Sequence, residues 1–369
     1  MKDLRIKKLA ENLVNYSCGV KKGEKVLIEA TDCDHMLVNE IIKLVYQKEA
    51  FPFVNFYDQK IKRELLLNTN KEHCRLMAKY AKFQMQDMNA YIGVRGGYNS
   101  YELSDIPAEN NKIYSSEYSH PVHHELRVKK TKWVVLRYPG AAVSQLFNLS
   151  SEKFEDFYFK VCNLSYEKMD KAMNPLKALM ESTDKVRILG KNTDLSFSIK
   201  GMKAVKCSGK HNIPDGEIYT APLKTSVNGR ISYNAPSIEN GLKHENIVLD
   251  FKDGKIINAS SNHKKELNKI LDTDEGARYV GEFALGVNPY IKEACGDILF
   301  DEKINGSLHF TPGCCYEDAD NGNNSAVHWD MVYIQTKKCG GGEIWFDDKL
   351  IRKDGVFVLE SLKALNNLK

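Results

Sequence analysis

The sequence predicts an α/β N-terminal domain with a mainly parallel sheet, followed by a β-rich α+β C-terminal domain. Three observations lead to this prediction. The first half alternates between apolar strand-like runs and amphipathic helix-like segments, which is typical of a parallel sheet covered by helices. From about residue 185, short strands with turn residues take over. A length of 369 residues fits about two domains, and we expect them to span 1–184 and 185–369.

The N-terminal half contains the expected elements of the parallel sheet in order. Residues 3–17 read as an amphipathic helix, and a second helix carries the apolar residues between Met36 and Val45. Buried strands, which read as short apolar runs, are expected at 25–30, 53–57, 90–94 and 132–137. Residues 151–182 are polar and are expected to form a long helical segment.

The C-terminal half is expected to be mostly β, interrupted by one helix at about residues 263–280. Asp253–Gly254 and Asn228–Gly229 are dipeptides that tolerate positive φ at low cost, so each signals a hairpin turn. Short strands are predicted at 186–189, 195–199, 226–227, 231–233 and 247–251.

Composition and charge argue against several classes of function. The 53 basic and 49 acidic residues leave a net charge of +4, and no basic stripe interleaves with aromatic residues, so no nucleic-acid partner is expected. The chain shows neither a secretory signal nor an apolar stretch of roughly 18–20 residues, so no membrane association is expected. The nine cysteines include no CxxC motif and are expected to be reduced thiols of a cytoplasmic protein.

Residues suited to metal binding concentrate in four short segments after residue 210, and two of these contain a glutamate. Glu217 follows the turn 214–216 at the start of a strand, where it could equally be a solvent-facing glutamate. Glu282 lies among glycines and apolar residues, where a carboxylate needs a partner, and Arg278 could be that partner. Glu275 is interpreted as a residue on a helix surface.

The other two segments contain histidines. His309 lies in a predicted strand and shares a face with Ser307, although a lone strand histidine is also common in a core or on a surface. His328 and Asp330 are two residues apart, so their side chains converge if the segment is a strand. A His-x-Asp pair also occurs often by chance, so this spacing alone leaves both interpretations open.

Together these residues form a ligand set that suits divalent metals. Imidazole nitrogen and carboxylate oxygen bind zinc, cobalt, manganese and iron. Three carboxylates and two imidazoles exceed the ligands of one tetrahedral zinc. They would fit two metals that share a carboxylate, which is the arrangement of aminopeptidases and phosphatases.

With these segments in view, the chain resembles the aminopeptidase S and aminopeptidase T family of dinuclear metallopeptidases, also called the thermophilic metalloprotease family. The resemblance covers nearly the whole chain, including the motifs at 23–30, 92–95, 102–107, 136–139, 154–157 and 193–195. Its most specific motifs follow in the family's order at 212–217, 281–286, 299–303 and 325–330.

The resemblance implies a metal-dependent aminopeptidase that releases N-terminal amino acids from short peptides by attack of a hydroxide bridging two metals. It implies two divalent metal ions per chain, zinc, cobalt or manganese, and a homodimer. Glu282 would bridge the metals, and Tyr316 matches a family tyrosine beside them. The implied metal ligands are Glu217, Glu282, His309, His328 and Asp330.

Two departures and two other hypotheses accompany this interpretation. The stretch between Tyr316 and His328 is shorter than the family predicts, and it follows the pair Cys314–Cys315, which could shape the pocket or oxidise. Two histidines with one aspartate also form the ligand set of a mononuclear iron ring-cleaving dioxygenase on the same scaffold. A non-enzymatic binder with a structural metal, or none, is the third hypothesis. The two glutamates favour two metals and hydrolysis.

Overall fold

The computed structural model describes residues 3–99, 101–239 and 241–368. The chain divides into two compact units. Unit 1 contains Met1–Asn163 and Gly209–Pro214, and unit 2 contains Leu164–Ser208 and Asp215–Lys369. This division describes only how the chain packs, and it does not test the functional domains predicted at 1–184 and 185–369. These domains therefore stay a prediction.

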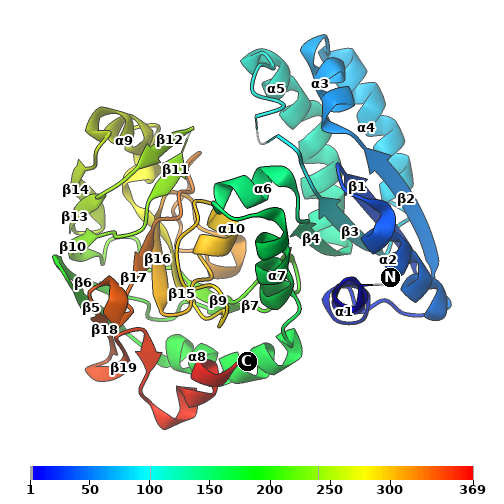
Figure 1. The fold of residues 1–369 in the computed structure, drawn as a ribbon. Coiled ribbons are helices and arrows are strands. Elements are labelled where there is room, and N and C mark those ends of the chain that lie inside the picture. The colour runs from blue at the N-terminus through cyan, green and yellow to red at the C-terminus, as the bar shows by residue number, and fades with distance from the viewer. Residues whose placement is uncertain (1–2, 100, 240, 369) are drawn as a thin grey trace. The chain divides into compact units, whose positions relative to one another are not determined.

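Unit 1 is built on a parallel sheet, as the sequence predicts (Figure 1). The strand order is β2-β1-β3-β4-β8. Of the inner strands, β3 is buried except at its last residue and β1 has no exposed residue, which explains their apolar runs, whereas β2 lies at the edge with most of its side chains exposed. The strands are β1 Lys25–Thr31, β2 Phe51–Tyr57, β3 Ala90–Arg95, β4 Lys132–Arg137 and β8 Asn212–Ile213.

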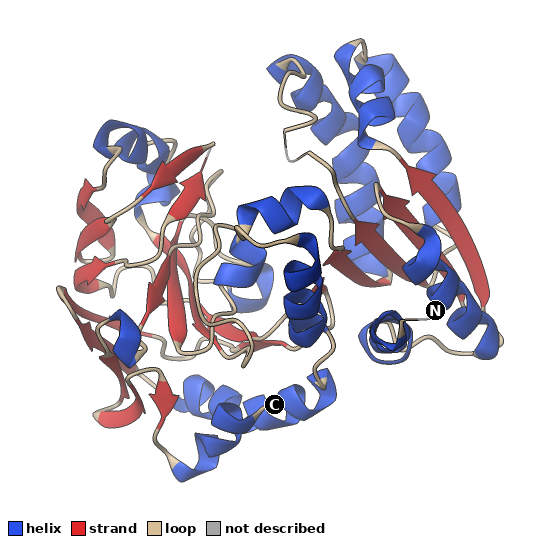
Figure 2. Ribbon diagram, in the orientation of Figure 1, coloured by secondary structure: helices blue, strands red, loops and turns tan. Residues whose placement is uncertain are grey.

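Helices cover the sheet of unit 1 (Figures 1 and 2). The first helix packs against α2, and α4 packs against η2. Side-chain caps fix several helix starts: Asp34 accepts a hydrogen bond from the Met36 N–H, and Asn70 accepts one from the His73 N–H. The helical segments are α1 Leu4–Glu11, η1 Asn12–Ser17, α2 His35–Gln47, α3 Gln59–Leu67, α4 Lys71–Met85, α5 Ala108–Tyr114, η2 Ser115–Val128, α6 Ala141–Leu146 and α7 Ser151–Cys162.

The long helical segment expected at 151–182 is two helices. The first, α7, ends at Cys162, and α8 (Tyr166–Ser182) begins after Ser165. The Ser165 hydroxyl accepts a hydrogen bond from the Lys168 N–H, so a side-chain cap starts a new helix here.

Unit 2 contains antiparallel sheets. One sheet has the order β14-β13-β10-β6-β5-β18-β19-β20, the second has the order β17-β16-β15-β9-β7, and β11 pairs with β12. Its strands are β5 Lys185–Gly190, β6 Thr193–Ser198, β7 Val205–Cys207, β9 Glu217–Thr220, β10 Asn228–Ser232, β11 Ser237–Glu239, β12 Leu242–His244, β13 Val248–Lys252, β14 Lys255–Ser260, β15 Val280–Gly286, β16 Ser307–Pro312, β17 Val332–Ile334, β18 Gly342–Phe346, β19 Lys349–Lys353 and β20 Val356–Phe357.

The helical segments of unit 2 are short apart from α8. The helix expected near 263–280 is α9, followed by a separate 3-10 turn that the Asp274 carboxylate caps through the Ala277 N–H. No described helix is both long enough and apolar enough to cross a membrane. The segments are α9 Lys264–Leu271, η3 Glu275–Arg278, α10 Ile298–Asp301, η4 Glu317–Ala319, η5 Lys337–Cys339 and η6 Glu360–Asn367.

Turn dipeptides in unit 2 gave one correct prediction and one wrong one. Asp253 and Gly254 both have positive φ and join β13 to β14, as expected for a hairpin. Asn228–Gly229 instead begins strand β10, and the predicted strand at 226–227 lies outside any strand. Glycine is required at 229 because its ideal Cβ position would be 2.2 Å from the Asp194 carbonyl oxygen on the neighbouring strand.

The two larger sheets of unit 2 pack through aromatic side chains. The Phe197 ring on β6 lies 5.0 Å from the rings of Phe283 on β15 and Phe310 on β16. Phe251 on β13 lies 5.9 Å from Phe310. Because side chains alternate along a strand, the residues on either side of Phe283 and Phe310 face away from this core.

Candidate metal centre

The candidate site begins on the face of β15 and β16 that points away from the aromatic core. Strand pairing places Glu282 opposite Thr311 and Ala284 opposite His309, so these side chains share that face. The neighbouring strand β9 places Glu217 opposite Gly286, on the same face as Ala284. All three strands are buried along their described length, so Glu217, Glu282 and His309 are brought together inside the protein.

Two carboxylates approach the same nitrogen of the His309 ring. Its Nε2 atom lies 3.1 Å from Oε1 of Glu282 and 3.5 Å from Oε2 of Glu217. The side chains of these residues are at most 8% exposed. Burying charged groups is costly unless they have partners, so the sequence-based alternative of a solvent-facing Glu217 is wrong.

His328 and Asp330 approach this group from a different segment. His328 forms only an isolated bridge with Gly313, and β17 begins later at Val332, so the strand predicted for 328–330 is an extended, irregular segment. The predicted convergence nevertheless holds. His328 Nε2 lies 3.5 Å from Oδ1 of Asp330 and 3.3 Å from Oε2 of Glu282.

The residue between His328 and Asp330 anchors their segment. Trp329 is 2% exposed, and its indole Nε1 donates a 2.8 Å hydrogen bond to the Ser237 hydroxyl. Its ring contacts the buried His244 ring edge-on at 5.0 Å. Because neighbouring side chains of extended backbone point to opposite sides, burying Trp329 directs His328 and Asp330 to the other side.

Further hydrogen bonds orient the candidate ligands. His328 Nδ1 lies 2.7 Å from the Cys314 carbonyl oxygen, so Nδ1 carries a proton, and Nε2 is the nitrogen that faces Glu282 and Asp330. The Thr311 hydroxyl donates to Oδ1 of Asp330 at 2.6 Å. Such contacts with the residues behind a ligand are typical of metal sites in proteins.

Two buried polar atoms test whether a metal fits here. Within the described residues, Oε2 of Glu217 and Nε2 of His328 have no hydrogen-bond partner. Buried polar atoms normally have partners, and once His328 loses its Nε2 proton both atoms are electron-pair donors that face other donors. The ligand atoms of Glu282, His328 and Asp330 lie within 4.8 Å of one another, and so do those of a second group that contains Glu217 and His309. A divalent cation fits both groups.

The electrostatics of the site show how its charges balance without a metal. Burial alone would lower the pKa of His309, but Glu217 and Glu282 raise it to about 10. Burial likewise opposes the charge on His328, but Asp330 and Glu282 raise its pKa to about 11. Protonated imidazoles therefore compensate the carboxylates, and a cation that binds here must displace those protons.

Tyr316 lies at the solvent side of the site. Its side chain is 47% exposed, and its ring centroid lies 4.7 Å from that of His328. Burial of its hydroxyl and the charges of Glu282 and Asp330 raise the pKa of Tyr316 well above its usual value, so the hydroxyl keeps its proton. Exposure rises from 1% for the His309 side chain to 23% for that of His328, so solvent reaches the site from the side of His328 and Tyr316.

The structure adds a charged pair that the sequence-based argument missed. Glu302 and Lys303 follow α10, and the Lys303 ammonium contacts Oε1 of Glu217 at 2.7 Å and the Glu302 carboxylate. A ligand atom of Glu302 lies within 4.8 Å of those of Glu217 and His309. The motif 299–303 contains both residues, but no local pattern in it points to a contact with β9.

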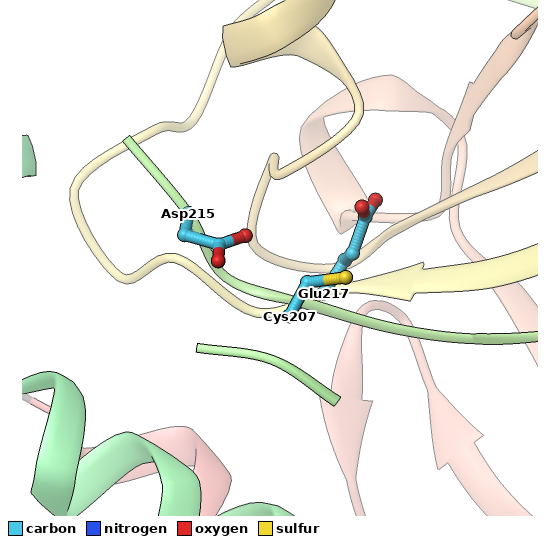
Figure 3. Close-up of side chains that lie close together, drawn as sticks. All are labelled: Cys207, Asp215 and Glu217. Carbon is cyan, nitrogen blue, oxygen red and sulfur yellow. The ribbon is translucent and has the colours of Figure 1, made fainter. Parts of the chain in front are cut away.

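A thiol and another carboxylate also lie close to Glu217. Figure 3 shows Cys207 at the end of β7, and Asp215 two residues before Glu217. One ligand atom from each of these three residues lies within 4.8 Å of the others. Burial, together with the charges of Glu217 and Asp215, raises the pKa of Cys207 well above its usual value, so this thiol is protonated.

The other cysteines near the site are also thiols. All nine cysteines, each in a described stretch of the chain, are free. Cys314 contributes its carbonyl oxygen to His328, and the Cys315 thiol lies 3.2 Å from the Asp320 carboxylate.

Comparison with known proteins identifies relatives along most of the chain. Aminopeptidase PepS from Streptococcus thermophilus is 26% identical over 389 residues, which cover 89% of this chain and 91% of that protein. Aminopeptidase AmpS from Bacillus subtilis (strain 168) is 26% identical over 368 residues, which cover 88% of this chain and 87% of that protein.

A solved structure and a family profile agree with these relatives. The structure of wild-type AmpT from Thermus thermophilus matches with a TM-score of 0.80 and 21% identity, covering 96% of this chain and 99% of that one. This match confirms the predicted fold class. The profile of the thermophilic metalloproteases (M29) matches residues 2–357. The chain therefore belongs to the thermophilic metalloprotease family.

Proposed function

We propose that this chain is a metal-dependent aminopeptidase that releases N-terminal amino acids from short peptides. The position of Glu282 carries the proposal. Its two carboxylate oxygens lie 3.1 Å from Nε2 of His309 and 3.3 Å from Nε2 of His328, so one carboxylate connects two groups of donors. Membership of a metalloprotease family and relatives named aminopeptidases support the same activity.

The arrangement of donors supports two divalent metals per chain. Glu282 is placed to be shared, with Glu217 and His309 on one side and His328 and Asp330 on the other. Nitrogen and oxygen donors of this kind suit zinc, cobalt or manganese. The only thiol among the grouped donors, that of Cys207, is a member of the group with Asp215 and not of the two histidine groups.

The residues around the donors have separate roles in hydrolysis. When bound, divalent cations lower the pKa of water and polarise the carbonyl of the scissile bond. Cys314 and Thr311 hold His328 and Asp330 in their orientations through hydrogen bonds. Tyr316, protonated and at the open side, is placed to donate a hydrogen bond to the oxyanion that develops as the carbonyl is attacked.

The alternative chemistry on these residues has less support. His309, His328 and Asp330 could bind one iron, as in a ring-cleaving dioxygenase. Glu282, however, contacts both histidines, and Glu217 also lies near Nε2 of His309, so the donors exceed those that one iron with open positions needs. The same excess of donors argues against a purely structural metal.

Substrate class, assembly and location follow from the same proposal. Short peptides are the expected substrates. A homodimer would help to enclose a site that admits only a free N-terminus, and light scattering on the purified protein would measure the oligomeric state. A cytoplasmic location is consistent with the nine free thiols.

The decisive experiment combines metal content with activity. The purified protein would be assayed on a panel of aminoacyl-aminomethylcoumarin substrates, before and after dialysis against a chelator, and after addition of Zn²⁺, Co²⁺ or Mn²⁺. We expect chelation to reduce activity at least about tenfold, and a metal to restore it. The matched control is the preferred substrate with an acetylated α-amine, which should not be cleaved.

Two results would overturn the proposal. Full activity in a sample shown to be metal-free would exclude the metal-dependent reaction. One iron per chain together with oxygen uptake would instead support the dioxygenase.

A further inference from the structure

Lys303 is a buried lysine beside the candidate metal centre. Its side chain is 1% exposed, and its Nζ atom donates to Oε1 of Glu217 at 2.7 Å and also contacts the Glu302 carboxylate. Hydrogen bonds hold its backbone in place, because the Lys303 N–H donates to the Phe300 carbonyl and its own carbonyl accepts from the Asn288 N–H. The ammonium group is therefore held at a defined position next to β9.

The surroundings of this ammonium explain why a lysine is buried here. Glu217, Glu302 and Asp215 act on it as negative charges, and the Glu217 side chain is itself only 8% exposed. A buried cation without partners is strongly unfavourable, and the same is true of buried carboxylates. Asp215, whose charge acts on Lys303 as well, and Cys207 lie close to Glu217 in Figure 3.

The two oxygens of Glu217 consequently have different neighbours. Oε1 is hydrogen-bonded to Lys303, whereas Oε2 lies 3.5 Å from Nε2 of His309 and has no hydrogen-bond partner among the described residues. We propose that Lys303 is a positioning residue that holds Oε1 of Glu217, so that Glu217 offers a metal only Oε2. This inference rests on the proposed metal-dependent function.

The proposed restraint has a consequence for catalysis. A carboxylate that binds a metal through both oxygens occupies two coordination positions, and a catalytic metal needs one position open for water or substrate. With Oε1 held by Lys303, Glu217 occupies one position only. In the absence of metal, the Lys303 ammonium provides the positive charge that stabilises Glu217 and Glu302. A bound metal cation would provide part of this stabilisation instead.

The substitution Lys303→Met tests this proposal, with Arg352→Met as the matched control. Arg352 is also fully buried in unit 2, but its described contacts are the Gln335 side chain and the Phe357 ring. Thermal unfolding would be measured in chelator and in saturating Zn²⁺ or Mn²⁺. Metal per chain, kcat and KM would be measured on the same samples.

We expect Lys303→Met to lower Tm by about 5 °C more in chelator than in metal, because the cation replaces the missing charge. It should still bind metal but lose kcat at least about tenfold, with KM within about threefold, because Glu217 can then close the open position. Arg352→Met should lower Tm by a similar amount in both conditions, with kcat within about threefold of the unchanged protein.

The outcomes separate this inference from the proposed function. An unchanged protein that neither binds metal nor gains Tm from it contradicts the proposed function itself. If the unchanged protein responds to metal but Lys303→Met loses equal Tm in both conditions, or keeps its kcat, Lys303 is only structural and the inference is wrong. Should Lys303→Met fail to fold in either condition, Lys303→Gln, which keeps a donor without the charge, is judged by Tm alone, and an equal loss of Tm in chelator and in metal would make the inference wrong.

Discussion

Replacing Glu282 by glutamine is the most direct test of the proposed metal centre. Glutamine keeps the size of the side chain and removes its charge. The carboxylate of Glu282 is 4% exposed and faces His309 through one oxygen and His328 through the other, so the substitution affects both donor groups at once. The amide retains one oxygen, so it can serve only one of the two groups.

The expected magnitude follows from these two contacts. A hydrogen bond to a charged group contributes roughly 1.5–3 kcal/mol, and at least one such interaction is lost when an oxygen becomes an NH₂ group. Since about 1.4 kcal/mol corresponds to a factor of ten, metal affinity should fall about ten- to hundredfold. Activity at a metal concentration that just saturates the unchanged protein should fall at least about tenfold.

Two measurements check this expectation. Competition with a chromophoric chelator gives the metal affinity, and elemental analysis after gel filtration gives the metal bound per chain. Glu275→Gln is the matched control, because Glu275 is an exposed glutamate in the same unit and should change neither quantity. If Glu282→Gln bound metal as tightly as the unchanged protein and kept its kcat, Glu282 could not be a shared ligand.

Two further predictions concern other parts of the molecule. Tyr316→Phe should lower kcat at least about tenfold while metal content stays unchanged, as measured on the same aminoacyl substrates, because it removes the proposed oxyanion donor. In unit 1, burial and the charge of Arg127 lower the pKa of His123 from 6.5 to about 4. Between these two pKa values the unfolded chain takes up a proton at His123 and the folded chain does not. The unfolding free energy is therefore full above pH 6.5, and it should fall by at most about 3 kcal/mol as the pH drops towards 4. Urea unfolding at pH 7 and pH 5 should show this loss, and His123→Phe should reduce it, whereas His35→Phe, at an exposed position of the same unit, should not.

The parts of the fold that local pattern determines were predictable from the sequence. Strands β1, β3 and β4 read as apolar runs because helices bury a parallel sheet on both faces. The break after α7 was missed because a cap such as Ser165 is a single residue within a polar, helix-favouring stretch. Asn228–Gly229 was misread because the same dipeptide serves a tight turn or a close approach between strands. Only the position of the neighbouring strand decides between these uses.

At the candidate site, too, the sequence predicted local features but not contacts between residues that are distant in the chain. Alternation along a strand placed His309 on a face, but it could not identify the partner that this face would meet. For Glu282 the sequence offered Arg278, four residues away, as an equally good partner. In the structure Arg278 binds Asp272 instead, and Glu282 faces two histidines that are 27 and 46 residues further along the chain.

The need to pair each buried carboxylate with a cation could have identified its partner only if the topology had been known. The buried donors of this site include Glu217, Glu282 and His309, and the permanent cation that contacts them within the described chain is Lys303. Lys303 comes from the turn after α10, 86 residues away from Glu217. A lysine next to a glutamate at 302–303 looks like a solvated surface pair in the sequence. Its burial shows that the protein stabilises Glu217 through Oε1 with its own cation, which leaves Oε2 as the oxygen that we propose for a metal.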